Sequence, residues 1–222
     1  MNGSRPCNLC VFDLDGTLTD PKIGITKSFQ YALSAFGIHE EADALTRHIG
    51  APLRGIFLTG YGLSEADTET AVAKYREHYA DKRLLENTVY RGIPEALRLL
   101  AGEGKQLAVA TSKVSLYTHQ ILEHFGFDGF FAFVSGDDMD GSLTINGKND
   151  IIRIALEHFS DVPKASAVMI GDRFHDMAGA KANGIDSIGV TWGYGSRAEL
   201  EEAGAGSIVD SPEELCRLLI GK

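Results

Sequence analysis

Asp13 and Asp15 are separated by one residue and follow an apolar run that is typical of a buried strand. Side chains two positions apart point to the same side of an extended chain. One carboxylate can therefore attack an electrophile while the other handles a proton. Gly16 permits a sharp turn of the backbone, which the side chain of Thr17 can hold. Alone, this segment also fits a polar turn or a fragment of a calcium loop, but the remaining EF-hand positions are absent.

Hydroxyl and amino groups follow two later segments. Thr111 and Ser112 end the apolar run that begins at Leu107, where they suit a phosphate oxygen, although such residues also end strands as helix caps. Lys148 begins an expected helix, where a lysine is unusual because the positive end of the helix dipole favours acids. An anion shared between this lysine and the helix end explains its position, and a solvated loop lysine is the simpler alternative.

A second pair of acids, Asp172 and Asp176, follows another apolar run. Hard oxygen ligands of this kind suit Mg²⁺, which takes one or two carboxylates and keeps several waters. His175 lies beside Asp176, but a single histidine next to better candidates is more often structural or exposed to solvent. We therefore take the two aspartates, and not the histidine, as the candidate residues of this segment.

Short β-rich runs alternate with helical patterns after about Arg91, which indicates a parallel sheet covered by helices on both faces. From Gly24 to about Leu84 the patterns are helical. We expect an α/β fold with a doubly wound, Rossmann-like parallel-sheet core, formed by residues 1–19 and 85–222, and a small all-helical cap domain, residues 20–84, inserted after the first strand. The expected strands are Leu9 to Leu14, Leu107 to Thr111, Phe131 to Val134, Ala167 to Ile170, Ser187 to Val190 and Ser207 to Val209. The expected cap helices are Ile25 to Phe36, Glu40 to Ile49, Leu53 to Thr59 and Ser64 to Arg83.

The four polar segments all fall at the C-terminal ends of expected strands. In open α/β sheets these ends converge on one crevice, where ligands bind. We therefore expect the four segments to form a single site, with the helical insert lying over it.

Composition excludes several classes of partner. The chain has 21 Lys and Arg against 31 Asp and Glu, a formal charge of −10, which repels nucleic acid. No run approaches the roughly 18 apolar residues that span a bilayer, and Met1 to Pro6 lacks the features of a secretion signal. We expect a cytoplasmic protein, a monomer or homodimer, that acts on a small phosphorylated metabolite and binds neither nucleic acid nor membrane.

The three cysteines predict free thiols in a reducing compartment. Cys7 and Cys10 form a C-x-x-C, a spacing used by redox and zinc sites. Within a strand, however, positions three apart point to opposite faces, and no second pair of ligands completes a metal site. We therefore interpret both as core thiols.

The four segments together resemble the signatures of the haloacid dehalogenase superfamily. The matching residues are the Asp13-x-Asp15-Gly16-Thr17 segment, Thr111 at a strand end, Lys148, and the Gly171-Asp172-x-x-x-Asp176 loop. The resemblance spans nearly the whole chain. The insert is similar to the helical C1-type cap of phosphoglycolate phosphatases and 5′-nucleotidase-like enzymes, and the segments 20–28 and 50–53 look closest to the nucleotidase-like group.

The resemblance implies a role for each matching residue. Asp13 is expected to be the nucleophile and a ligand of Mg²⁺, and Asp15 the general acid and base, which also binds the metal through its backbone carbonyl. We expect neighbouring carboxylates to raise the pKa of Asp15. Asp172 completes the metal site, with Asp176, Gly16 and Thr17 in support.

The phosphoryl oxygens are expected to bind Thr111, Ser112 and Lys148, and the cap residues Arg54 and Lys22 are candidate contacts to the rest of the substrate. The implied activity is that of a Mg²⁺-dependent phosphatase with an aspartyl-phosphate intermediate. Asp15 makes halide chemistry unlikely by the same resemblance, because dehalogenases lack a second acid there. A phosphomutase with the same site, and a non-catalytic phosphate-binding module, are the alternatives.

Overall fold

The computed structural model describes residues 7–139, 141–144 and 148–221. Residues 1–6 and Lys222, which the sequence assigns to the core, lie outside the described residues. Within the described part, no helix combines the length and the apolar character needed to cross a membrane.

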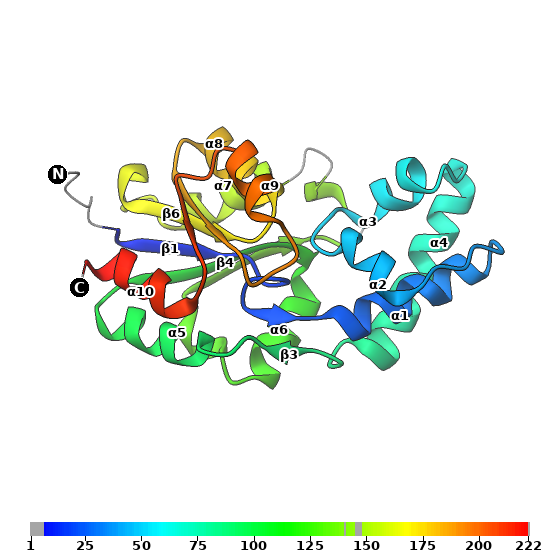
Figure 1. The fold of residues 1–222 in the computed structure, drawn as a ribbon, viewed down its shortest axis with the longest axis horizontal. Helices are drawn as coiled ribbons and strands as arrows, with labels where there is room; N and C mark the ends of the chain where they lie inside the picture. Colours follow the sequence, from blue (N-terminus) through cyan, green and yellow to red (C-terminus); the bar gives the residue numbers. More distant parts are fainter. Residues whose placement is uncertain (1–6, 140, 145–147, 222) are drawn as a thin grey trace.

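The core is a six-stranded, wholly parallel sheet in the order β5-β4-β1-β6-β7-β8 (Figure 1). The chain builds the sheet outward from β1 to β4 and β5, then returns to place β6 on the other side of β1. This order is the doubly wound arrangement that the sequence predicts. The strands are β1 (Leu9–Phe12), β4 (Gln106–Val114), β5 (Phe133–Asp137), β6 (Ala167–Gly171), β7 (Asp186–Val190) and β8 (Ser207–Val209).

Helices cover both faces of this sheet, which is why its central strands β1 and β6 are apolar throughout and do not alternate with polar residues. Leu9 and Val11 of β1 pack in one buried cluster with α7 and α8, whereas Cys10 and Phe12 pack in the other with α5, α6 and α10. The core helices are α5 (Ile93–Gly102), α6 (Ser115–His124), α7 (Asn149–His158), α8 (Phe174–Asn183), α9 (Arg197–Glu202) and α10 (Pro212–Ile220).

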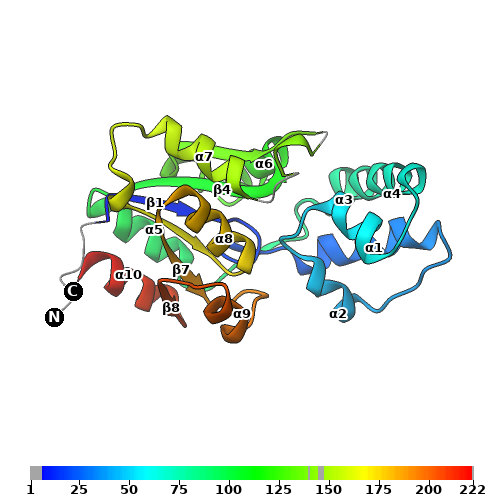
Figure 2. The same cartoon turned by 90° about the horizontal axis from the view of Figure 1, so that it is seen from above.

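The cap is a group of helices inserted between β1 and β4, and it stands beside the ends of the strands (Figure 2). Its centre is aromatic: the ring of Phe29 lies 4.8 Å from that of Tyr75 and 5.6 Å from that of Phe57, centroid to centroid. Its elements are α1 (Lys22–Ser34), α2 (Ala42–Leu45), α3 (Leu53–Gly55) and α4 (Glu65–His78), with π-helical turns at Ile56–Gly60 and Tyr79–Arg83.

A short antiparallel ribbon joins cap and core. It pairs β2 (Thr19–Asp20) with β3 (Thr88–Val89), one on the way out of the core and one on the way back. We propose that this ribbon marks the boundary between the two parts, close to the division after residues 19 and 84 that the sequence suggests. Two-residue strands carry no periodicity, so the sequence does not reveal them.

The cap helices differ from expectation in length. The helix expected over Glu40 to Ile49 is wrong, because only Ala42–Leu45 is α-helical and a 3₁₀ turn follows. The helix expected over Ser64 to Arg83 ends at His78, where a π-helical turn takes over. Its predicted start is confirmed, since the Ser64 hydroxyl accepts a hydrogen bond of 3.1 Å from the backbone N–H of Asp67.

Candidate active site

The candidate site lies at the C-terminal end of β1, where the strand order reverses and a crevice opens. Asp13 is the first residue after the strand, and its backbone N–H donates to the carbonyl of Ile170 at 2.9 Å. Asp172, one residue beyond β6, and Asp176, in the first turn of α8, are fully buried beside it. Two adjacent strands thus bring together three carboxylates that are far apart in the sequence.

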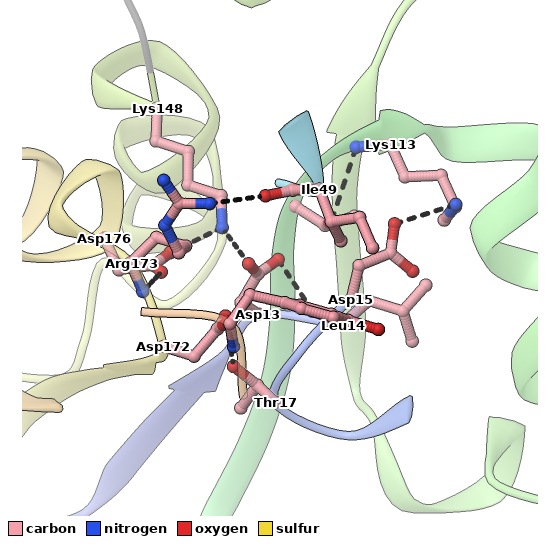
Figure 3. A network of polar contacts seen from close by, with 12 residues as sticks. Asp13, Leu14, Asp15, Thr17, Ile49, Lys113, Lys148, Asp172, Arg173 and Asp176 are labelled. Carbon is pink, nitrogen blue, oxygen red and sulfur yellow. Dashed lines mark hydrogen bonds and ion pairs between the residues drawn. The ribbon is translucent and has the colours of Figure 1, made fainter. Parts of the chain in front are cut away.

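Lys148 is the cation that these acids share (Figure 3). It caps the start of α7, and its Nζ lies 2.6 Å from Asp13 Oδ2 and also donates to Asp176 Oδ1. Burial alone lowers the pKa of Lys148, but Asp13 and Asp176 raise it above the usual range, so the ammonium stays charged. The start of a helix is the position that the sequence marks as unusual for a lysine. In the structure the partners of Lys148 there are two carboxylates of the protein, those of Asp13 and Asp176.

One ammonium does not neutralise three buried carboxylates. Burial, followed by the charges of Asp176 and Asp13, raises the pKa of Asp172 to about 8. Burial likewise raises the pKa of Asp176 to about 6, although Lys148 opposes the shift. The three acids therefore carry more negative charge than Lys148 can neutralise.

A divalent cation bound by the three acids would balance this negative charge. Asp13, Asp172 and Asp176 each offer an oxygen within 4.8 Å of the others. All-carboxylate oxygen donors suit a hard ion such as Mg²⁺. The side chain of Asp15 does not belong to this group, so metal binding through its backbone carbonyl stays a prediction.

Asp15 turns instead toward Lys113, whose Nζ lies 2.8 Å from its Oδ2. The same ammonium donates to the hydroxyl of the cap residue Tyr79 at 2.7 Å. Within the described residues, the other oxygen of Asp15 is buried without a hydrogen-bond partner. Lys113 is a site residue that the sequence reasoning missed, although it directly follows the two hydroxyl residues at the end of β4.

The pKa of Asp15 is raised, in the expected direction but for a different main reason. Burial is the largest cause, Lys113 lowers the pKa, and Asp13 adds a smaller increase. The strand expected over Leu9 to Leu14 ends at Phe12, so Asp13 and Asp15 both lie beyond it. The two side chains nevertheless line the same cavity.

A tight loop holds Asp172 in place. Gly16 has a φ of +84°, and a Cβ on it would lie 2.2 Å from Asp172 Oδ2, so only glycine fits. The hydroxyl of Thr17 donates to Asp172 Oδ1 at 3.4 Å. The sequence suggested that this side chain holds the turn, but its partner is the acid. The backbone N–H of Tyr194 donates to Asp172 Oδ2 at 2.7 Å.

The two hydroxyl residues at the end of β4 reach the same cavity. Thr111 and Ser112 both line it, and the buried Thr111 Oγ1 accepts a hydrogen bond of 3.3 Å from the backbone N–H of Lys113. Their predicted contact with phosphoryl oxygens stays a prediction. His175 also lines the cavity, and burial followed by the charge of Lys148 lowers its pKa to about 4, so it is neutral at pH 7.

The cavity has a volume of about 710 Å³ and lies between core and cap. Arg54 lines it from the cap, and its Nε pairs with Glu69 at 2.8 Å. Lys22, the other candidate cap contact, is not among the lining residues and pairs with the exposed Asp43 at 2.7 Å. The structure thus brings Arg54 to the site and leaves Lys22 outside it.

Arg173 links the core to the cap segment that precedes the helix of Arg54. Its Nη1 donates to the carbonyl of Ile49 at 2.9 Å (Figure 3), and its Nε pairs with Glu199 at 2.8 Å. It is a second residue that the sequence reasoning passed over, although it stands directly after Asp172.

Residues 10–190 match the model of the haloacid dehalogenase-like hydrolases. The chain belongs to this family. It is 46% identical to a 5′-nucleotidase of Pseudomonas aeruginosa, with 86% of this chain and 85% of the relative covered. It is 40% identical to the tyrosine-protein kinase PtkA of Mycobacterium tuberculosis, covering 87% of this chain and 65% of that protein. A crystal structure of a predicted phosphatase from Clostridium acetobutylicum has a TM-score of 0.93 and 42% identity, covering 98% of this chain and all of the other.

The family match confirms the resemblance seen in the sequence. The high structural similarity to the phosphatase from Clostridium acetobutylicum agrees with the parallel-sheet fold.

Proposed function

We propose that this chain is a Mg²⁺-dependent phosphatase that hydrolyses a small phosphate monoester through an aspartyl-phosphate on Asp13. Its broad class, a phosphoric monoester hydrolase of the haloacid dehalogenase-like family, is supported by the family model and by the names of its relatives. One observation carries the mechanism: the buried carboxylate of Asp13, at the crevice of the sheet, pairs with a buried lysine and lies close to two further buried acids.

Asp13 is placed to act as the nucleophile. One of its oxygens is bound by Lys148 at 2.6 Å and the other accepts the backbone N–H of Leu14 at 2.7 Å, so the carboxylate is fixed in orientation. A phosphate monoester carries nearly two negative charges at neutral pH and is repelled by this group. Asp13, Asp172 and Asp176 would hold Mg²⁺, which would supply positive charge to offset this repulsion and to stabilise the transferring group.

Asp15 is placed to move the proton. In its acid form it donates to the leaving oxygen, and in its basic form it takes a proton from the attacking water. Its buried position favours the protonated form at the start, whereas Lys113 at 2.8 Å favours the ionised form that follows. Thr111, Ser112 and Lys148 would hold the phosphoryl oxygens while Asp15 alternates between these states.

The walls of the cavity favour a nucleoside monophosphate over phosphoglycolate. Aromatic side chains from cap and core line it, and its 710 Å³ exceeds what a two-carbon acid fills. The parts of these buried rings that reach the cavity give it an apolar wall against which a base can pack. The aromatic lining residues are Phe29, Tyr75, Tyr79 and Tyr117.

A phosphate-release screen tests this function. The full chain, with Mg²⁺ or with a chelator, is offered nucleoside monophosphates, phosphoglycolate, sugar phosphates and pyrophosphate. We expect inorganic phosphate from the nucleoside monophosphates, with loss of release on chelation and recovery when Mg²⁺ is returned. A mutase or a kinase would pass the phosphoryl group to another acceptor and release none. Release that is indifferent to chelation contradicts the metal assignment.

Arg54→Ala is expected to raise KM for the preferred nucleoside monophosphate by roughly 10-fold, as loss of a charge-assisted contact does. Lys22→Ala is the matched control, because each residue pairs with an acid on the cap surface and only Arg54 lines the cavity. We expect no change of KM in the Lys22 variant. Steady-state kinetics measure both, and equal effects in the two variants would show that Arg54 acts through the cap surface and not through substrate.

A further inference from the structure

Cys7 and Cys10 touch each other. Their sulfurs lie 3.6 Å apart, with Cys7 half-buried and Cys10 fully buried. The expectation that the two side chains point to opposite faces is wrong, because Cys7 precedes β1 and strand alternation does not extend to it. Its Sγ also approaches the carbonyl of Leu9 at 3.5 Å, so the side chain folds back over the start of the strand.

The surroundings make the two thiols unequal. The hydrogen bond between the sulfurs lowers the pKa of Cys7, burial opposes the shift, and the charge of Lys105 supports it. Lys105 is held in place because its Nζ donates to the carbonyl of Cys7 at 2.6 Å. The same sulfur contact, together with burial, raises the pKa of Cys10 well above its usual value. A half-buried thiol with a lowered pKa thus stands beside a buried thiol with a raised pKa, which is the arrangement of attacking and resolving thiols.

We propose that Cys7 and Cys10 are a redox-active pair that hydrogen peroxide converts from two thiols to a disulfide. The Cys7 thiolate attacks one peroxide oxygen, the O–O bond breaks, and the departing oxygen takes up a proton to leave as water. Cys7 is then a sulfenic acid. The Cys10 sulfur attacks it, the S–S bond forms as the S–O bond breaks, and the hydroxyl leaves with the Cys10 proton as a second water.

The sulfurs must approach from 3.6 Å to the length of a disulfide, about 2.05 Å. Cys10 is held on both sides, because it pairs with Leu107 of β4 and Val168 of β6. Cys7 lies before β1, so we expect its side chain to supply the movement. Asp13, at the other end of β1, stays in place, so the oxidised protein is expected to keep its hydrolytic activity.

Peptide mapping of the full chain tests the pair independently of the proposed phosphatase function. The protein is treated with hydrogen peroxide, unfolded in iodoacetamide and digested with trypsin, so that one peptide contains both Cys7 and Cys10. We expect that peptide to be unalkylated and two hydrogens lighter, Cys216 to be alkylated, and dithiothreitol to restore alkylation at both sites. Two alkylated cysteines after treatment, or a sulfinic acid at Cys7, would overturn the proposal.

Variants test the order of the steps. In Cys10→Ser the sulfenic acid on Cys7 is expected to persist and to react with dimedone, since its resolving thiol is gone. In Cys7→Ser, Cys10 is expected to remain a thiol, and Cys216→Ser is expected to behave like the unmodified chain. Because Cys7 is half-buried and Cys10 is buried, we expect Cys7→Ser to fold even if Cys10→Ser does not fold. Oxidation of Cys10 in folded Cys7→Ser at the rate of the unmodified chain contradicts the proposed order.

Discussion

Asp13→Asn is expected to lower kcat/KM by about 10⁴-fold or more, the scale of loss when an essential nucleophile is removed. The amide keeps the shape of the carboxylate but cannot attack phosphorus. It also removes one negative charge from the group that Lys148 and the metal would share. Phosphate release under saturating Mg²⁺ and substrate measures the effect.

Asp210→Asn is the matched control for this change. Asp210 is exposed, pairs with Arg197 at 2.6 Å and does not line the cavity, so its variant should keep full activity. Circular dichroism and thermal unfolding establish that both variants fold. A folded Asp13→Asn protein with ordinary turnover would mean that a different group, or water directly, attacks the substrate.

Asp15→Asn is expected to lower kcat by roughly 10²- to 10⁴-fold, the range that general acid and base catalysis supplies. The physical reason is that an unprotonated alkoxide is a poor leaving group. Because burial raises the pKa of Asp15, its acid form persists to higher pH than that of an exposed aspartate. Activity of the unmodified enzyme should therefore fall as pH rises through this pKa, and the variant should lose this limb of the pH profile.

Substrates whose leaving groups differ in their need for a proton test the role of Asp15. A p-nitrophenyl ester departs without a proton, so the first step should survive in Asp15→Asn, whereas the second step still lacks its base. We expect a rapid burst of p-nitrophenol followed by slow turnover with this ester. A uniform loss on the nitrophenyl ester and on a nucleoside monophosphate, with no burst, would be inconsistent with proton transfer by Asp15.

The sheet was predictable because parallel strands buried on both faces are continuous apolar runs bounded by polar residues. All six strands of the core lie where the sequence indicates them, with shifts of a few residues at the ends. The ribbon of β2 and β3 and the break of the cap helices into π-helical and 3₁₀ turns were not predictable, since they depend on how cap and core meet. The local periodicity of the sequence contains no information about the contact between cap and core.

The acids of the site were predictable from the sequence because they follow apolar runs that are typical of buried strands. The structure brings Asp13, Asp172 and Asp176 together as the strand ends suggest. Lys113 escaped notice because its partners, Asp15 and the cap residue Tyr79, are brought to it only by tertiary packing. The contact between Cys7 and Cys10 escaped for a related reason, namely that the strand begins two residues later than the alternation argument requires.

Trapping the phosphorylated enzyme tests the central claim most directly. The full chain with Mg²⁺ is mixed with its preferred phosphate monoester, quenched in acid during turnover, digested, and mapped by mass spectrometry. We expect one phosphoryl group on the side chain of Asp13, released by hydroxylamine as an acyl phosphate is, and absent from Asp13→Asn. Rapid turnover with no acyl phosphate at any quench time, or with the phosphoryl group on another residue, would contradict the mechanism.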